Sequence, residues 1–254
     1  MVTISPINAF SDNYIWLIER GQHAYVVDPG EPEPVLTRLA ERGLELTGIL
    51  ITHHHFDHTG AVQVLQEKTG CDTWGPAGSP AGVFDHTVTE GDQVSVLGES
   101  FEVLEVPGHT LDHIAYHCAT QSALFCGDTL FVGGCGRVFE GTTMQMRASL
   151  EKLSVLPTDT RIYCAHEYTL GNLAFAQMVE PDNAALAAFA AACQDKRARD
   201  LPTVPSVLEG ELRYNPFLRW SSSAIRQTLI DTGRLHDDSP DGVFSAVREW
   251  KNQA

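Results

Sequence analysis

The sequence is poor in basic residues and has no long hydrophobic run. Its 254 residues contain 17 Lys and Arg against 33 Asp and Glu, which gives a formal net charge of −16. Because phosphate binding needs clustered cations, this imbalance argues against a nucleic-acid-binding surface. No run of roughly eighteen apolar residues occurs, so no membrane span is expected. Neither a nucleic-acid-binding protein nor a membrane-spanning one is therefore expected.

Paired cysteines and a recognisable leader are also missing. The six cysteines show no C-x-x-C spacing, and most of them lie in apolar, strand-like runs. Reduced, buried thiols are therefore expected. The first residues, Met1–Pro6, lack a basic segment followed by an apolar core, so no secretory signal is expected and a cytoplasmic location is predicted. A hydrophobic content of 43% suffices for a sizeable core in one large domain, or in one domain with a modest addition.

One dense group of metal-binding residue types stands out. It is the stretch His53-His54-His55-Phe56-Asp57-His58, which follows an apolar, β-branched run over residues 46–52. That run predicts a buried strand, so the histidines lie at a strand end, where His53 and His55 share one face and His54 points the other way. Imidazoles and carboxylates are good zinc ligands. A solvated, histidine-rich loop is the alternative, but composition, spacing and placement together favour a metal site.

Three further residues follow the same local pattern. His109, Asp128 and His166 each come after a short apolar strand and a small residue. A single histidine after a strand is usually an ordinary polar loop residue. Three such positions in a chain that also carries the dense stretch favour additional ligands, as two metal ions would require.

The character of the chain changes near residue 166. Short apolar runs typical of strands alternate with a few helical segments up to that point. A helix is predicted over residues 58–68, a hairpin over residues 114–118 and 123–126, and the run Arg161–Ala165 is the last predicted strand. Helical periodicity and abundant alanine follow over Leu170–Val179 and Ala184–Arg199. Many adjacent strands with few long helices predict two sheets with helices outside. We therefore predict a first domain over residues 1–166 and a helical domain over residues 167–254.

The motif His53-x-His55-x-Asp57-His58, with His109, Asp128 and His166, resembles the signature of the metallo-β-lactamase superfamily. More narrowly, the chain resembles the glyoxalase II, or hydroxyacylglutathione hydrolase, family. The narrower likeness is carried by further segments along nearly the whole chain: 7–14, 127–131, 134–137, 140–142, 166–169 and 214–219. Segment 26–30 resembles the first motif of the wider superfamily.

The resemblance implies an α+β fold, the αββα sandwich, followed by a smaller helical C-terminal domain. It implies one metal ion on His53, His55 and His109, a second on Asp57, His58 and His166, and Asp128 bridging the two. Zinc is expected, with iron and manganese also compatible with these ligands. The implied reaction is hydrolysis of S-(2-hydroxyacyl)glutathione, such as S-lactoylglutathione, by a hydroxide that bridges the metals. This is the second step of methylglyoxal detoxification, and Asp57 would be the catalytic residue, orienting the nucleophile.

The resemblance also implies substrate contacts at Arg137, Phe139, Tyr168 and Arg219. A guanidinium can hold a carboxylate through two hydrogen bonds, so both arginines suit an anionic peptide. Phe139 stands where related chains often have tyrosine, so one hydrogen bond is expected to be missing. The stretch directly after Arg219, Trp220–Ser223, has no lysine, unlike many eukaryotic relatives. The alternative for each position is a surface cation or a half-buried ring.

Several alternatives remain open at this point. A persulfide dioxygenase with one iron, a nuclease and a non-catalytic metal-binding module all use related scaffolds. The full ligand set, the acidity and the helical C-terminal half favour the thioester hydrolase. A glutathione thioester is its expected small-molecule partner. A monomer is expected, although no feature of the sequence indicates the oligomeric state. Asp28 is expected either to support a ligand histidine or to serve as a plain turn carboxylate. His54 is expected to be packed or hydrogen-bonded rather than a ligand.

Overall fold

The structure is a computed structural model that describes residues 2–82 and 84–254. Its packing divides the chain into two units that interleave in sequence. The first unit comprises Met1–Glu105 and Asp112–Gly127, and the second comprises Val106–Leu111 and Asp128–Ala254. The two units do not divide after residue 166, where the domain boundary was predicted. That boundary stays a prediction.

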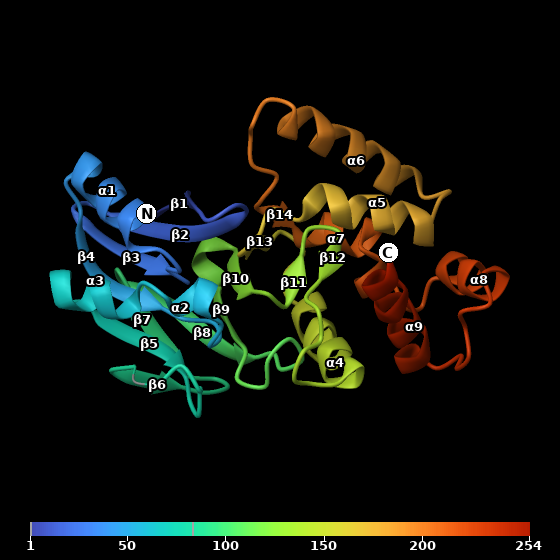
Figure 1. Ribbon diagram of the computed structural model, residues 1–254, viewed down its shortest axis with the longest axis horizontal. Coiled ribbons are helices and arrows are strands. Elements are labelled where there is room, and N and C mark those ends of the chain that lie inside the picture. The colour runs from blue at the N-terminus through green and yellow to red at the C-terminus, as the bar shows by residue number, and fades with distance from the viewer. Residues whose placement is uncertain (1, 83) are drawn as a thin grey trace. The chain divides into compact units, whose positions relative to one another are not determined.

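The first unit is built on a mixed sheet with the strand order β1-β2-β3-β4-β5-β6 (Figure 1). Strands β1 to β3 pair antiparallel, and β3 to β6 pair parallel. The strands are β1 Thr3–Ala9, β2 Asn13–Arg20, β3 His23–Val27, β4 Glu45–Leu50, β5 Asp72–Pro76 and β6 His86–Val88. Parallel pairing requires crossovers. Helix α1 (Pro32–Arg42) supplies the one before β4, and helices α2 (Phe56–Thr59) and α3 (Val62–Thr69) supply the one before β5.

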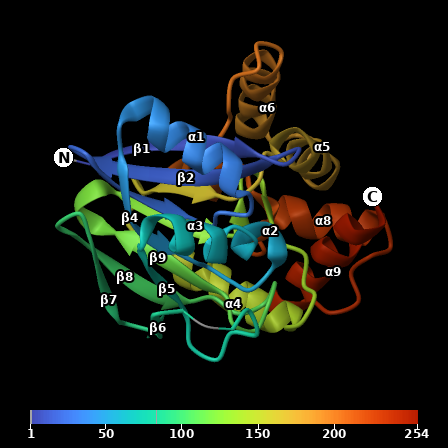
Figure 2. The ribbon, with the colours of Figure 1, turned by 60° about the vertical axis from the view of Figure 1, so that its left-hand side comes forward.

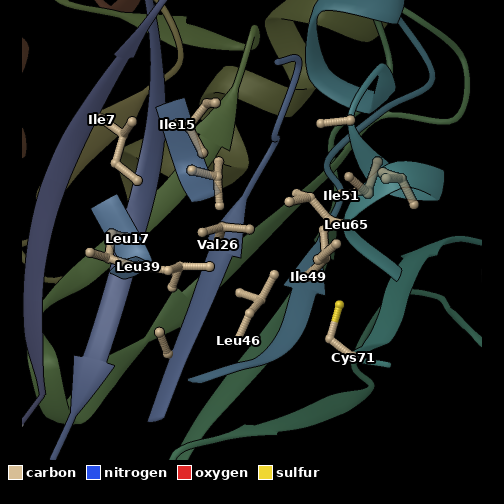
Figure 3. Close-up of a cluster of buried hydrophobic side chains, with 14 of the residues drawn as sticks. Ile7, Ile15, Leu17, Val26, Leu39, Leu46, Ile49, Ile51, Leu65 and Cys71 are labelled. Carbon is tan, nitrogen blue, oxygen red and sulfur yellow. The ribbon is translucent and has the colours of Figure 1, made fainter. Parts of the chain in front are cut away.

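Helices α1 and α3 cover one face of this sheet (Figure 2). Helix α1 has proline in its first turn, buries Val35 and Leu39, and ends at Gly43, whose φ of 62° closes the helix in the left-handed conformation. The aliphatic side chains of β1 to β4 meet those of the two helices in a buried cluster (Figure 3). This core holds β4 rigidly, and β4 is the strand that leads into the histidine-rich stretch.

A single helix was predicted over residues 58–68, and that prediction was wrong in detail. Helix α2 ends at Thr59 and α3 begins at Val62. The backbone packs closely at the break, because a Cβ atom on Gly60 would lie 2.7 Å from the carbonyl oxygen of Gly30. The close contact fixes α2 as a short, separate turn.

A second set of strands in the first unit pairs antiparallel in the order β10-β9-β8-β7. These are β7 Gln93–Val96, β8 Glu99–Glu105, β9 Ile114–Cys118 and β10 Ala123–Gly127, with the 3₁₀ turn η1 (Ala119–Gln121) between the last two. The Tyr116 hydroxyl on β9 donates a 2.9 Å hydrogen bond to the carbonyl oxygen of Ile51, just beyond β4. The two-sheet fold and the hairpin of β9 and β10 predicted from the sequence are confirmed.

The second unit is mainly helical after residue 168, as predicted (Figure 1). Its elements are β11 Leu130–Phe131, β12 Gly134–Cys135, α4 Thr143–Ser154, β13 Arg161–Cys164, α5 Thr169–Val179, α6 Ala184–Arg197, β14 Ser206–Val207, α7 Leu208–Tyr214, η2 Pro216–Leu218, α8 Ser223–Asp231 and α9 Pro240–Gln253. One expectation was wrong: β13 is not the last strand, because β14 pairs antiparallel with it. A two-residue strand carries no alternating pattern that sequence reasoning could detect.

The six cysteines are buried, free thiols, as predicted. Within residues 2–82 and 84–254, no helix is long and apolar enough to cross a membrane.

Candidate metal centre

The first unit presents its predicted ligands at the carboxyl end of β4. The His53 ring centroid lies 4.7 Å from that of His55 and 4.1 Å from that of His58. The ligand atoms of His53 and His55, and those of His53 and His58, lie within 4.8 Å of one another. The strand end and the short helix α2 thus bring three imidazoles together. We call His53, His55, Asp57 and His58 the first half-site.

Asp28 contacts both His58 of this half-site and Thr52, the residue just before it. One carboxylate oxygen accepts the Thr52 backbone N–H and the other accepts the Thr52 hydroxyl, both at 2.8 Å. The second oxygen also lies 3.1 Å from Nδ1 of the buried His58. The Thr52 Oγ1 atom in turn lies 3.1 Å from Nδ1 of His53. Of the two roles considered for Asp28, the structure therefore shows the support of a candidate ligand histidine.

Asp57 is positioned by two residues that sequence reasoning did not single out for this task. Asn13 donates a 2.9 Å hydrogen bond from Nδ2 to Oδ2 of Asp57. The Asp57 backbone packs so closely on Gly30 that a Cβ atom there would lie 2.0 Å from the Asp57 carbonyl oxygen. Only glycine permits that approach. Asn13 gave no usable signal of its own, because an asparagine where a strand begins is an ordinary turn residue.

The second unit places Asp128 between two histidines. The Oδ2 atom of Asp128 lies 3.4 Å from Nε2 of His109, and its Oδ1 atom lies 3.3 Å from Nε2 of His166. All three side chains are buried. A carboxylate that offers one oxygen to each of two imidazoles has the arrangement expected of a ligand that bridges two ions. We call these three residues the second half-site.

Backbone contacts fix the ring of His109. Its Nδ1 atom donates a 2.7 Å hydrogen bond to the Arg137 carbonyl oxygen, which leaves Nε2 to face Asp128. Gly136 packs against both Asp128 and His109. A Cβ atom on Gly136 would lie 1.9 Å from the Asp128 carbonyl oxygen and 3.3 Å from Nδ1 of His109. The His166 ring stacks on Tyr168 at a centroid distance of 4.6 Å.

The spacing of these atoms fits a metal ion. Two ligand atoms bound at about 2.1 Å to one tetrahedral ion are about 3.4 Å apart. The two Asp128 contacts match this value, and so does the 3.4 Å between Nε2 of His58 and Oδ2 of Asp57. Neutral imidazoles and carboxylates suit zinc, iron and manganese alike. Each half-site therefore has the donor types and spacing for a divalent ion.

Three of the four predicted substrate residues lie beside the second half-site. The Arg137 guanidinium lies 5.3 Å from the centroid of the Phe139 ring. Phe139 meets the His109 ring edge-on at 5.2 Å, and Tyr168 stacks on His166. Phe139 and Tyr168 are exposed, so a ligand can reach both rings.

The fourth, Arg219, has a different environment. Its Nε and Nη2 atoms donate to the two carboxylate oxygens of Glu180 at 3.0 and 2.8 Å. Burial alone would raise the pKa of Glu180, but hydrogen bonds from Arg219, Asn183 and Ser222 outweigh it and lower that pKa. Arg219 lines an open pocket of about 630 Å³ whose walls include none of the seven predicted metal ligands.

Two further histidines pack against the first half-site. His54 lies 2.9 Å through Nδ1 from Asp112, which also accepts a hydrogen bond from Ser79, so His54 is hydrogen-bonded as expected. His113 stacks on the His53 ring at 4.5 Å with an interplanar angle of 15°. Its supporting role was not foreseen, because a histidine within a strand region has no distinctive spacing.

Comparison with known proteins places the chain in a family. Residues 10–166 match the model of the metallo-beta-lactamase superfamily, and residues 167–254 match the model of the hydroxyacylglutathione hydrolase C-terminus. The hydroxyacylglutathione hydrolase of Pseudomonas aeruginosa is 48% identical over 100% of both chains. That of Chromohalobacter salexigens is 46% identical over the same share. That of Photobacterium profundum is 48% identical over 99% of each chain.

Solved structures agree on the fold. The crystal structure of ETHE1 from Myxococcus xanthus matches with a TM-score of 0.66 and 27% identity, covering 99% of this chain and 98% of that one. The BLEG-1 B3 metallo-beta-lactamase matches with a TM-score of 0.65 and 21% identity, covering 86% and 100%. The fold and the histidine-rich site thus define a metallo-beta-lactamase superfamily protein. Within that superfamily, the chain belongs to the hydroxyacylglutathione hydrolase family.

Proposed function

We propose that the protein hydrolyses S-(2-hydroxyacyl)glutathione thioesters, such as S-lactoylglutathione, to the free hydroxy acid and glutathione. The observation that carries the proposal is Asp128, whose two oxygens face two different histidines at 3.3 and 3.4 Å. Full-length identity of 44–48% to hydroxyacylglutathione hydrolases supports the substrate class. On this basis the reaction is the second step of methylglyoxal detoxification.

The two half-sites are proposed to act as one centre with two divalent ions. His53, His55 and His109 would hold one ion, Asp57, His58 and His166 the other, and Asp128 both. Such a pair, when bound, would lower the pKa of a coordinated water molecule and would polarise the thioester carbonyl. Zinc is the proposed metal, and iron and manganese fit the same donors.

Asp57 is the proposed catalytic residue. Its Oδ2 atom accepts the Asn13 amide hydrogen bond and lies 3.4 Å from Nε2 of His58, and these contacts restrain the carboxylate that would orient the attacking water. Attack by the water oxygen forms a C–O bond at the acyl carbon, and the C–S bond then breaks. One proton of the water ends on the glutathione sulfur and the other passes to solvent, so the products are the hydroxy acid carboxylate and glutathione. Because glutathione leaves as a thiolate, the site needs no strong general acid.

Arg137, Phe139, Tyr168 and Arg219 are the proposed substrate contacts. Arg137 and Tyr168 present a guanidinium and a hydroxyl beside the second half-site, where an anionic peptide could be held. Phe139 offers a ring face but no hydrogen bond. In Arg219, the Nη1 atom makes a long 3.4 Å hydrogen bond to the Leu212 carbonyl oxygen, so this edge is the one left for a carboxylate.

The test measures loss of the thioester and oxygen uptake together, on purified protein whose metals have been counted. Thioester turnover with about two metal ions per chain and no oxygen uptake is expected. Alanine at Asp57 or Asp128 should reduce metal content and turnover together. His23→Ala is the matched control, because this exposed histidine pairs with Glu45 on the surface.

The same measurement decides between the proposed function and its rivals. Oxygen uptake with one iron per chain would show a persulfide dioxygenase, and no turnover with metal bound would show a binding module. Full activity in either aspartate variant would contradict the ligand assignment. We further propose a cytoplasmic monomer, in line with the six free, buried thiols, and size-exclusion chromatography with light scattering tests the oligomeric state.

A further inference from the structure

The segment that carries part of the second half-site is held by buried polar side chains from the C-terminal helices. This segment, residues 128–137, runs from Asp128 through the β11–β12 hairpin to Arg137. Asn172 on α5 donates to the Val132 carbonyl oxygen at 3.2 Å. Asn215, which follows α7, donates to the carbonyl oxygens of Phe131 at 3.2 Å and Gly134 at 2.9 Å.

Glu211 on α7 completes the hold on the hairpin turn. This fully buried carboxylate accepts the Gly133 N–H at 2.9 Å and the Asn215 amide at 2.9 Å. Burial raises the pKa of Glu211, and hydrogen bonds from its neighbours offset only part of that effect. Burying a carboxylate this deeply costs free energy, and its hydrogen bonds to Gly133 and Asn215 offset part of that cost.

Arg248 on α9 extends the support past the hairpin. This buried guanidinium donates from Nη1 to the Cys135 carbonyl oxygen at 3.0 Å and to the Gly136 carbonyl oxygen at 3.4 Å. Its Nε atom donates to Asn252 at 3.2 Å, and its Cζ atom lies 5.0 Å from the centroid of the Phe217 ring. The stack and the Asn252 contact fix the direction in which Nη1 points.

The Cys135 and Gly136 carbonyls, which Arg248 contacts, come directly before Arg137, whose carbonyl orients His109. Gly136 packs against the Asp128 carbonyl oxygen and Nδ1 of His109 so closely that no Cβ atom fits. The next carbonyl, that of Arg137, accepts the His109 Nδ1 proton at 2.7 Å. Movement of the Cys135–Gly136 backbone would therefore change both the ring orientation of His109 and its distance from Asp128.

We propose that Arg248 is a positioning residue for the metal ligand His109, acting through the Cys135 and Gly136 carbonyls. The inference rests on the proposed metal role of His109 and Asp128. Outer contacts of this kind typically change metal affinity about 10- to 100-fold when removed. A residue that served only to stabilise the fold could be replaced by an apolar side chain of similar size with little effect on metal binding.

The experiment compares Arg248→Met with wild type in zinc affinity, measured by competition with a chromophoric chelator well below the unfolding temperature. Methionine keeps much of the packing on Phe217 and removes the donors. We expect about 10-fold or more weaker binding, with an altered visible spectrum of the cobalt-substituted protein. Arg147→Met is the control, because Arg147 likewise lies near an aromatic ring, 5.4 Å from the Trp220 centroid, but its partner is the Asp241 carboxylate and not the backbone beside His109.

Two outcomes would overturn the inference. One is a folded Arg248→Met variant with wild-type zinc affinity and cobalt spectrum, whatever its unfolding temperature. The other is an equal loss of affinity in Arg147→Met, which would show a general effect of destabilisation. If Arg248→Met does not fold, Arg248→Gln is measured in the same way. Its amide nitrogen stands two bonds closer to Cα than Nη1 of arginine and so falls short of the Cys135 and Gly136 carbonyls, and wild-type affinity in it would overturn the inference as well.

His109→Ala separates this inference from the proposed function. Wild-type zinc affinity in His109→Ala would contradict the metal role of His109 itself. Loss of affinity in His109→Ala without loss in Arg248→Met would contradict only the role of Arg248.

Discussion

The two half-sites use the same residue types but are assembled in different ways. The first lies within six consecutive residues after one strand, and Asp28, Thr52 and Asn13 hold it through side-chain contacts. The second gathers residues from three separate segments, and backbone carbonyls and the C-terminal helices hold it. A local half-site depends on one strand end being in place. A dispersed one depends on every segment that supports it.

The largest expected effects come from the two glycines at the closest backbone contacts. Gly30→Ala and Gly136→Ala would place a Cβ atom 2.0 and 1.9 Å from a backbone oxygen, of Asp57 and Asp128 respectively. Backbone cannot yield as a flexible side chain can, so we expect roughly 100-fold or greater loss of turnover in both variants. Steady-state assays with metal analysis check this result.

Gly171→Ala is the control for both glycine variants. A Cβ atom at this position in α5 meets no atom within 4 Å. It should leave turnover unchanged and stabilise the protein by up to about 1 kcal/mol, since alanine favours a helix over glycine. Wild-type turnover in Gly136→Ala alone would show that only the first half-site is rigid.

Asp28→Ala is expected to weaken the first half-site strongly. It removes two hydrogen bonds to Thr52 and the carboxylate beside His58. We expect a loss of about 2–4 kcal/mol in the free energy of unfolding and at least about 10-fold in zinc affinity. Denaturant titration and chelator competition measure the two quantities. If zinc affinity is unchanged, the carboxylate serves the turn alone.

Arg137 and Arg219 should differ in how their loss affects catalysis. Arg137→Ala removes a cation beside the second half-site and is expected to raise KM about 10-fold with kcat little changed, because charged hydrogen bonds contribute about 1.5–3 kcal/mol. Arg219→Ala also leaves Glu180 buried without its cation, so it should lower stability as well. Thermal unfolding measured beside KM separates the two, and an unchanged KM in Arg219→Ala would make that residue purely structural.

Two buried acids in the second unit should give opposite pH effects. The pKa of Glu180 is lowered from 4.5, so its contribution to stability is present above pH 4.5 and is lost as the pH falls through its folded pKa. The pKa of Glu211 is raised from 4.5, so its contribution is present below pH 4.5 and is lost as the pH rises through its folded pKa. Unfolding curves against pH for Glu180→Gln and Glu211→Gln should therefore depart from wild type in opposite directions. Unfolding curves that depart from wild type in the same direction in both variants would contradict the opposite pKa shifts of Glu180 and Glu211.

Phe139→Tyr should give the smallest effect. A hydroxyl on this exposed ring would restore one hydrogen bond to substrate, worth about 1 kcal/mol, and lower KM about fivefold. Competition assays with a thioester series that differs only in the acyl group would show whether the gain belongs to the glutathione half. A gain that varies with the acyl group would place Phe139 beside that group instead.

Much of the fold and the identity of the candidate ligands could be predicted from the sequence. Apolar runs predicted β4, the β9–β10 hairpin and the helical second half, because strand and helix periodicity is a local property. The short strands β11, β12 and β14 could not be predicted, since two residues carry no period. The break between α2 and α3 escaped prediction as well, because it depends on the approach of Gly30, which is distant in sequence.

By itself, the sequence determined the chemistry of the site: neutral imidazoles and carboxylates placed at strand ends, on an acidic chain poorly suited to nucleic acid. The tertiary structure alone decided how those groups are held. It placed Asn13 on Asp57, stacked His113 on His53, turned Arg219 toward Glu180 and set Arg248 on the backbone beside His109. The physical reason is that the donor atom a ligand offers depends only on its residue type, which the sequence gives directly. Its orientation depends on hydrogen bonds to residues that only folding brings near.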